Sequence, residues 1–315
     1  MSQAEGMAAF DALSGDSQHS FDLALRELGR SIDGATSPAE ASASVGSVSA
    51  MRATQPTDPL HTLHTPVLCV VAQGQKQVLL GDERIAYSAG DFLLNSVTLP
   101  ATGHVIGASP EAPCLWMVIE LDPALVGSVI VEAGLASPHP NAPLRAMEAG
   151  RLTRPLLDGV VRLARGFDSP RDAPFLAPLA LREIIYHLGT GEQGARLHQI
   201  VAGGAQVQRV MRAIAWVRHN FDQPLSLDAL AKEAGMSLSA LHHHFKDVTA
   251  LSPLQFQKQM RLQEAKRLMV SQDMDAASAG YKVGYDDASH FNRDYRRFFG
   301  HPPRQHIALV RGQWL

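Results

Sequence analysis

Two short segments near the carboxyl end carry side chains that suit contacts with a nucleic acid. If each segment is a helix, its outward face holds hydrogen-bond donors for base edges and phosphates, and such a helix fits the major groove of DNA. These side chains are Ser239, His242, His243 and Lys246 in the first segment, and Ser289, His290, Asn292, Arg293, Arg296 and Arg297 in the second. For one segment alone, a solvated polar helix face explains the same residues.

Both segments lie in a sequence unit that occurs twice. The run AKEAGM at 231–236 aligns with GYKVGY at 280–285 at an offset of 49 residues, and the later core positions align at an offset of 50. Each copy has the pattern of a helix-turn-helix, and we predict units over residues 226–246 and 275–298. Two copies in tandem favour DNA binding over a solvated polar face.

Each copy also carries its own caps, turn and core. Gly235 and Gly284 are expected to make the turns, because glycine adopts left-handed backbone readily. Helix caps are predicted at Ser226 and Ser237 in the first copy, and at Asp286 or Asp287 in the second. The predicted core positions are Leu241 and Phe245 in the first copy, and Phe291, Tyr295 and Phe298 in the second.

A single helix is predicted between the two units, over residues 253–270. At ~1.5 Å per residue it spans about 27 Å, close to one turn of DNA at about 34 Å. Such a rigid spacer would let one chain read two successive major-groove segments on one face of the duplex.

Charge divides the chain in the same place. The 315 residues carry a formal net charge of −3, yet residues 206–315 hold 15 lysines and arginines against 10 aspartates and glutamates. A basic tail on an acidic body indicates a polyanion partner for the tail. No apolar run is long enough to span a membrane, and no secretory signal is evident. From the absence of a long apolar run we expect no membrane partner. Two cysteines are too few for a disulfide framework, so we expect a cytoplasmic protein.

The segments before residue 206 predict a separate α+β part. Residues 18–33 can form a short amphipathic helix, and the small residues of 34–50 indicate a flexible linker. Short strands with Gly and Asp turns predict a small antiparallel barrel followed by helices, over 51–188. The five glycines within 189–206 indicate an interdomain linker over 189–205, with room for a short helix at 195–201. Residues 206–315 would then form an all-α domain.

The tail resembles the DNA-binding domain of the AraC/XylS family of transcription regulators. The resemblance covers about residues 206–308 and rests on LDALAKEAGMSLSALHHHFKDVTALSPLQF, RLQEAKRLM and VGYDDASHFNRDYRRFFGHPP. It implies base-facing positions at Ser239, His242, His243, Ala288, Ser289, His290 and Arg293. Two departures are Ala250, where the family usually has glycine, and the His242–His244 run, which leaves the preferred bases open.

The front half is similar to the N-terminal domain of one subgroup of the same family. The resembling stretches are HTLHTPVLCVVAQGQKQVLLGDERIAYSAGDFLLNSVTLPATG and LREIIYHLGTGEQGARLHQI. The resemblance implies a cupin-like barrel with helices that receives a small-molecule signal and forms a homodimer. Double-stranded promoter DNA and RNA polymerase are the implied partners of an activator. The sequence identifies neither the effector nor the operator.

Five residues are candidates for the effector site. Cys69, in an apolar strand, is either inert packing or the target of an electrophile, as is thought for some sensors of this subgroup. His61 and His64 lie on the barrel segment. Arg26 and Arg30 are four residues apart on the first helix. Either they belong to a solvated face, or they bind the phosphate of a nucleotide.

The rival interpretations are a cupin-type metalloenzyme with an accessory helical domain and a module that binds another protein. A cupin enzyme needs a His-x-His cluster with a carboxylate, and His61, His64 and His104 form no such cluster. No Ser-His-Asp motif or phosphate-binding loop is evident. Adjacent helical residues lie about 100° apart, so the three consecutive histidines 242–244 cannot all face one ion. We therefore expect no enzyme activity, no cofactor and no metal site.

Overall fold

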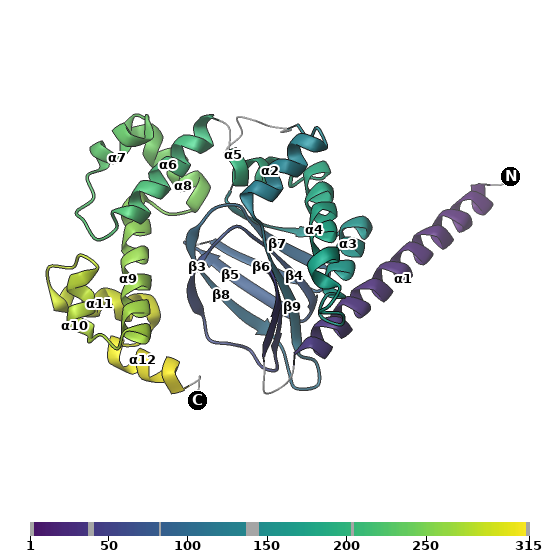
Figure 1. The fold of residues 1–315 in the computed structure, drawn as a ribbon, viewed down its shortest axis with the longest axis horizontal. Coiled ribbons are helices and arrows are strands. Elements are labelled where there is room, and N and C mark those ends of the chain that lie inside the picture. The colour runs from purple at the N-terminus through teal and green to yellow at the C-terminus, as the bar shows by residue number, and fades with distance from the viewer. Residues whose placement is uncertain (1–2, 37–40, 82, 137–144, 203–204, 313–315) are drawn as a thin grey trace.

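The computed structural model describes residues 3–36, 41–81, 83–136, 145–202 and 205–312. Ten strands and five helices form the N-terminal part, and seven helices form the C-terminal part, within these described ranges. Figure 1 shows the strands between two groups of helices, with the C-terminal helices on one side. The predicted α+β fold, an antiparallel sheet domain followed by an all-α domain, is confirmed.

The strands form two antiparallel sheets, in which several neighbouring strands are far apart in the sequence. One sheet has the order β1-β2-β9-β4-β7-β10 and the other β3-β8-β5-β6. The strands are β1 (Ser42–Val45), β2 (Val48–Ala53), β3 (Leu60–His64), β4 (Val67–Gln73), β5 (Gln75–Leu80), β6 (Glu83–Ser88), β7 (Asp91–Asn95), β8 (Leu99–Gly107), β9 (Cys114–Glu120) and β10 (Met147–Arg151). Strands β5 and β6 form a hairpin, and Gly81 between them has a φ of +61°.

The six-stranded sheet is buried on both faces, which explains the continuous apolar run of β4. Leu68 and Val70 pack outward against helices, whereas Cys69 and Val71 point into the space between the two sheets. Successive side chains of a strand alternate between its faces. The barrel therefore has one core inside and a second core under its outer helices.

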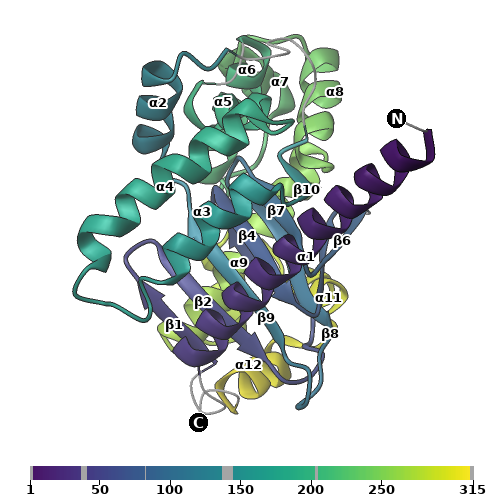
Figure 2. The same cartoon turned by 90° about the vertical axis from the view of Figure 1, so that its right-hand side faces the viewer.

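Five helices belong to the N-terminal part. They are α1 (Gln3–Ala35), α2 (Pro123–Glu132), α3 (Arg154–Ala164), α4 (Ala173–Thr190) and α5 (Gly194–Ala202). Figure 2 shows α1 and α3 lying across the outer face of the six-stranded sheet. Leu28 and Ile32 of α1 are fully buried there, so this helix is part of the domain.

The predicted flexible linker over 34–50 is wrong for residues 41–50. These residues form β1 and the first half of β2, and β2 pairs with β9 along its whole length. Val48 and Ala50 are buried while Ser49 between them is less so, a two-residue period that the small side chains hide in the sequence. The strands of the domain therefore begin at Ser42 rather than after residue 51, and residues 37–40 lie outside the described ranges.

The predicted linker over 189–205 is also corrected. The expected short helix is present as α5, and its Leu197, Gln199 and Ile200 are buried against the barrel side. A segment that buries apolar surface is held in place rather than free. Residues 203–204 lie outside the described ranges.

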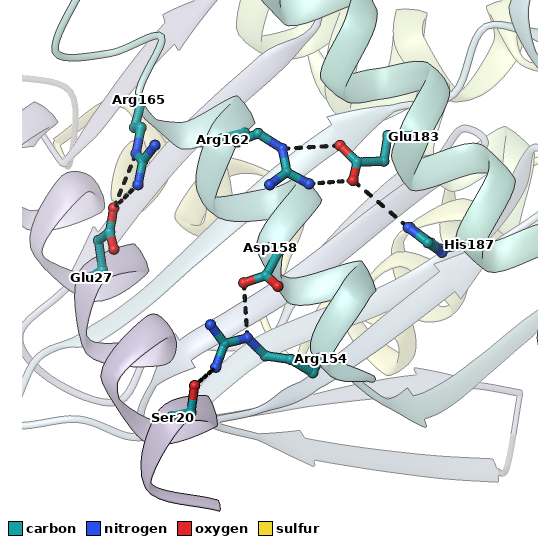
Figure 3. A network of polar contacts seen from close by, with 8 residues as sticks. All are labelled: Ser20, Glu27, Arg154, Asp158, Arg162, Arg165, Glu183 and His187. Atoms are coloured by element: carbon teal, nitrogen blue, oxygen red, sulfur yellow. Dashed lines mark hydrogen bonds and ion pairs between the residues drawn. The ribbon is translucent and has the colours of Figure 1, made fainter. Parts of the chain in front are cut away.

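Ion pairs on the surface link α1, α3 and α4 (Figure 3). Arg165, the residue after α3, contacts Glu27 of α1 at 2.7 Å, and Arg162 of α3 contacts Glu183 of α4. Such exposed pairs contribute about 0–1 kcal/mol each. They align helices whose position the apolar core determines.

The C-terminal part consists of seven helices. They are α6 (Ala205–His219), α7 (Leu227–Ala234), α8 (Leu238–Thr249), α9 (Pro253–Ser271), α10 (Ala276–Lys282), α11 (Ala288–Phe299) and α12 (Pro303–Gly312). In Figure 1, α9 lies beside the barrel, where it contacts β3 and β8. The two predicted helix-turn-helix units correspond to α7–α8 and α10–α11.

Candidate nucleic-acid interface

The first unit forms as its sequence predicts. Ser226 Oγ accepts a hydrogen bond from the Ala229 amide at 3.3 Å, and Ser237 Oγ accepts one from Ala240 at 3.2 Å. Gly235 between the helices has a φ of +66°, a left-handed conformation that glycine allows. Leu241 and Phe245 of α8 are fully buried. Their burial turns the opposite face of α8 outward.

The second unit has the same plan. Asp287 is the N-cap of α11, where its Oδ1 accepts a hydrogen bond from His290 at 2.7 Å, and Gly284 in the turn has a φ of +91°. Phe291 and Tyr295 are fully buried as predicted.

The third core position of α11 differs from the prediction. Phe299 is buried, whereas Phe298 is only partly so. Phe299 follows Tyr295 by four residues, and their ring centroids lie 4.4 Å apart. The core stripe of α11 therefore runs at a spacing of four residues.

The structure places the predicted DNA-contacting residues on two exposed helix faces. Exposed on α8 are Ser239, His242, His243 and Lys246, and exposed on α11 are Ser289, His290, Asn292, Arg293, Arg296 and Arg297. Ala288, the first residue of α11, is half-buried. An open hollow of about 590 Å³ follows the end of α11, lined by Asn292, Arg293, Arg296, Arg297, Gly300 and Pro302.

The arginines of α11 are available to bind anions. Within the part of the chain that the structure describes, no carboxylate pairs with Arg293, Arg296 or Arg297. Asp294 on the same helix pairs with Lys258 at 3.0 Å instead. A group of unpaired guanidinium groups beside a hollow suits phosphate oxygens.

Helix α9 joins the two units through both of their cores. Phe256 near its start packs edge-on against Phe245, with ring centroids 5.4 Å apart, whereas Leu262 and Leu268 lie in the core of the second unit. The helix begins at a capping box formed by Ser252 and Gln255. Its nineteen residues span about 28 Å at ~1.5 Å each.

Arg261 fixes the second unit relative to the first, a role that the sequence did not indicate. Its guanidinium donates hydrogen bonds to the carbonyls of Phe221 at 2.6 Å, Gln223 at 2.9 Å and Gly284 at 2.8 Å. A side chain at position 284 would collide with the Asp222 carbonyl, since a Cβ there would lie 2.0 Å from its oxygen. The turn of the second unit is thus held against the loop after α6.

The barrel holds the end of α8 directly. Arg145 Nη1 donates hydrogen bonds to the carbonyls of Lys246 at 2.7 Å and Asp247 at 2.8 Å, and the Ala146 amide donates to Val248 at 3.0 Å. Arg145 also pairs with Glu83. A cation at a helix C-terminus is favourable because the last carbonyls carry partial negative charge.

A buried polar network connects this contact to α5. Ser96 Oγ lies 2.6 Å from Gln199 Oε1 of α5 and 3.0 Å from the Ala146 carbonyl. Arg196 of α5 donates to the Arg145 carbonyl at 3.2 Å. The barrel, α5 and the first unit are therefore coupled through residues 145–146, which no sequence motif indicated.

Inside the barrel, Cys69 lies in a polar cluster. Its Sγ is 3.7 Å from Lys76 Nζ and 3.6 Å from the Tyr87 hydroxyl, and Lys76 Nζ lies 3.9 Å above the ring of Trp116. Burial raises the pKa of Tyr87 well above its ordinary value, and the neighbouring Cys69 adds to the effect. Burial likewise raises the pKa of the nearby Cys114 thiol to about 11. Among the described residues, no carboxylate pairs with Lys76.

The five predicted effector residues do not form one site. His64 Nε2 lies 3.1 Å from Thr62 Oγ1, and burial together with Lys76 lowers the pKa of His64 to about 4. The side chain of His61 lies outside the described part of the structure. Arg26 and Arg30 are exposed on α1, which covers the opposite face of the sheet from Cys69.

Within the described residues, one group of three His, Cys, Asp or Glu side chains lies within reach of a single metal ion. It is on α8 and consists of His243, His244 and Asp247. His64 and His104 of the barrel are not part of such a group.

Comparison with known proteins gives two family matches. Residues 44–196 match the AraC-type transcriptional regulator N-terminus, and residues 230–308 match a helix-turn-helix domain. The transcriptional activator RhaS of Escherichia coli is 26% identical over 155 residues, which cover 49% of this chain and 55% of RhaS. RhaS of Escherichia fergusonii is 32% identical over 97 residues, 31% of this chain and 35% of that protein. The chain spans about half the length of the curated relatives it matches.

Solved structures share the fold over most of the chain. ToxT from Vibrio cholerae aligns with a TM-score of 0.55 and 9% identity, covering 82% of this chain and 97% of ToxT. A ToxT structure with a bound unsaturated fatty acid aligns with a TM-score of 0.52 and 7% identity, covering 84% and 96%. None of the described helices has the length and apolar character needed to cross a membrane.

Proposed function

Because this chain belongs to the AraC/XylS family of transcription regulators, we propose that it binds double-stranded DNA and reads it with α8 and α11. The two helices enter adjacent major-groove segments, and a small-molecule signal received by the N-terminal domain controls the binding. The chain acts as a regulator rather than as an enzyme.

The observation that carries this proposal is the pair of matched exposed faces on one rigid support. Both helices bury aromatic side chains inward and present hydrogen-bond donors outward. The first half of the spacer helix α9 packs in the core of the first unit, and its second half packs in the core of the second unit. A span of about 28 Å is close to one DNA turn of about 34 Å, so both helices can lie on one face of the duplex.

The contacts proposed for the two helices differ in kind. Ser239, His242 and His243 of α8 are neutral or weakly charged donors that suit base edges. Arg293, Arg296 and Arg297 of α11 are permanent cations without partners in the described structure, and they suit phosphates and guanine edges. Affinity should therefore fall steeply with salt because phosphate contacts release counterions.

We place the effector site between the two sheets, at Lys76. Its ammonium group lies among Cys69, Tyr87 and Trp116 without a carboxylate partner in the described residues, which suits an anionic group on an apolar ligand. The ToxT structure that carries an unsaturated fatty acid shares this fold. Cys69 and His64 line this region, whereas Arg26 and Arg30 do not.

The exposed face of α4 supports the proposed homodimer. On one face of α4, Leu181, Ile184, Ile185 and Leu188 are buried in the core. Phe175, Leu176 and Leu179 are instead exposed, with Phe175 at 76%. An apolar patch of this kind favours contact with a second copy.

We also propose that RNA polymerase is a partner, that the protein activates transcription, and that it is located in the cytoplasm.

Selection of bound duplexes from a random library by the full chain tests the proposal. We expect enrichment of two sequence elements about 10 base pairs apart. The variant Arg293→Ala/Arg296→Ala should lose this enrichment, while Arg171→Ala, which removes an exposed arginine of the barrel part, should keep it. Folded protein that enriches no sequence would overturn the proposal.

A further inference from the structure

Two of the three consecutive histidines of α8 meet a carboxylate one turn later. His243 Nε2 lies 3.3 Å from Asp247 Oδ2, and His244 Nδ1 lies 3.8 Å from the same oxygen. The ligand atoms of these three residues all lie within 4.8 Å of one another. Imidazole and carboxylate are ligands that first-row divalent transition metals accept.

Helix geometry explains why this set converges when three consecutive histidines do not. At about 100° per residue, His244 lies 100° around the helix from His243, and Asp247 lies about 40° around, between the two. His242 lies on the far side of His243 from Asp247. Three consecutive histidines alone cannot surround one ion, but Asp247 one turn later lies centrally between His243 and His244.

Asp247 is held in place and lacks a hydrogen bond at its ligand atom. Its Oδ2 is buried without a hydrogen-bond partner in the described structure, while its main-chain carbonyl accepts from Arg145 at 2.8 Å. A buried acceptor left without a partner is unfavourable, and a bound cation would satisfy it. Asp247 lies in the last turn of α8, where the helix dipole also favours positive charge.

The cluster opens to solvent on one side. The side chain of His243 is 72% exposed, against 31% for His244 and 29% for Asp247. An ion can therefore enter beside His243 and keep water on its remaining coordination positions, as in sites with three protein ligands.

We propose that His243, His244 and Asp247 bind one divalent transition-metal ion of the zinc class on the first reading helix. The ion holds the His243 ring beside Asp247, where it cannot contact a base, so it weakens recognition by the first unit. This second step rests on the proposed function, whereas metal binding itself does not.

Titration of the untagged, metal-stripped full chain with Co²⁺ tests the site through visible d–d absorption, and titration with Zn²⁺ by calorimetry gives the affinity. We expect one ion per chain. Asp247→Asn and His243→Gln should each weaken binding at least about tenfold. The matched control is His242→Gln, which removes the neighbouring imidazole outside the set and should bind as the unaltered chain does.

Equal loss in the control, or unchanged binding in Asp247→Asn with a native circular dichroism spectrum, would overturn the site. The regulatory step is tested on a selected duplex, where Zn²⁺ should weaken DNA binding several-fold in the unaltered chain and not in Asp247→Asn. Unchanged DNA affinity with Zn²⁺ bound would refute that step alone. A chain that binds no DNA would refute the proposed function, and the Co²⁺ titration would still decide the metal site.

Discussion

The two helix-turn-helix units share one plan but have different surroundings. The last carbonyls of α8 in the first unit accept hydrogen bonds from Arg145 and Ala146 of the barrel part. The polar contacts described for Asp294 of α11 stay within the C-terminal helices. The unit next to the barrel displays histidines, and the distant unit displays arginines. The first unit thus contacts the barrel directly through α8, whereas Arg261 of α9 holds the turn of the second unit.

The helix that ends each unit shows the same contrast at one residue. Gly300 follows α11 with a φ of +81°, and Ala250 follows α8 with a φ of +58°. Alanine thus keeps the left-handed turn at which the family usually has glycine, at a cost of about 1–2 kcal/mol. The unit that the barrel supports is the one that tolerates this strain.

The largest expected effect comes from the buried aromatic rings. Phe245→Ala and Phe291→Ala should each cost about 3–5 kcal/mol of unfolding free energy, because both side chains are fully buried. The core of Phe245 is continuous with the barrel core, whereas that of Phe291 is separate. In denaturant titrations, we expect Phe291→Ala to produce an early, separate transition and Phe245→Ala to lower the main one. An unchanged midpoint in either variant would show that the core face is misplaced.

Acid should destabilise both parts through one histidine in each. The pKa of His64 is lowered to about 4 by burial and Lys76, and that of His306 to about 4 by burial, Lys266 and His301. The unfolded chain therefore binds more protons between about pH 6.5 and 4, so stability is complete above that window and falls as pH drops through it. For His64 the loss reaches at most about 3 kcal/mol, and it is smaller for the half-exposed His306.

Melting curves from pH 7.5 to 4 check this prediction. His64→Asn should flatten the pH dependence of the barrel transition, and His306→Asn that of the second unit. A slope that survives both substitutions would assign the acid sensitivity to other groups.

Substitutions on the two reading helices should lower DNA affinity by different amounts, and both effects should be smaller than those of the buried aromatic rings. Arg293→Ala should cost about 1–3 kcal/mol of binding free energy, since it removes a base or phosphate contact. His242→Ala on α8 should cost less and leave the salt dependence unchanged, because it removes no permanent charge. Gel-shift titrations at several fixed salt concentrations distinguish the two, and unaltered affinity in Arg293→Ala would remove it from the interface.

The smallest effect should come from exchanging the two turn residues. Gly300→Ala should cost about 1 kcal/mol, because a Cβ there meets open space and only the left-handed backbone opposes it. Ala250→Gly should gain less than about 1 kcal/mol, since the relief of strain is partly offset by the greater freedom of the unfolded chain. Thermal unfolding measures both, and shifts of the same sign would contradict the comparison.

Features that depend on neighbouring residues, such as helix caps and turns, could be predicted from the sequence, whereas pairing between distant segments could not. Ser226, Ser237 and Gly235 act on neighbours within four residues, so their types alone indicate caps and a turn. The pairing of residues 48–53 with β9 joins a segment of mainly small side chains to a distant apolar strand, and no local pattern indicates which strand is the partner.

The functional site shows the same division. The exposed residues of α8 and α11 follow from helical periodicity once the core face is known. The grip of Arg145 on the carbonyls of Lys246 and Asp247 spans more than a hundred residues of sequence and involves main-chain atoms, which carry no sequence signature. The prediction of Phe298 as the third core position of α11 was wrong because Phe298 and Phe299 both fit a period of 3.6 within one residue.

The three carbonyls gripped by Arg261 have a consequence for the shape of a cognate operator. One extra base pair between the two contacted elements rotates the second by about 35° around the duplex. A protein whose two readers were hinged could follow that rotation, but a clamped pair cannot. We therefore expect the operators of this chain to differ in base sequence far more readily than in the number of base pairs between the two contacted elements.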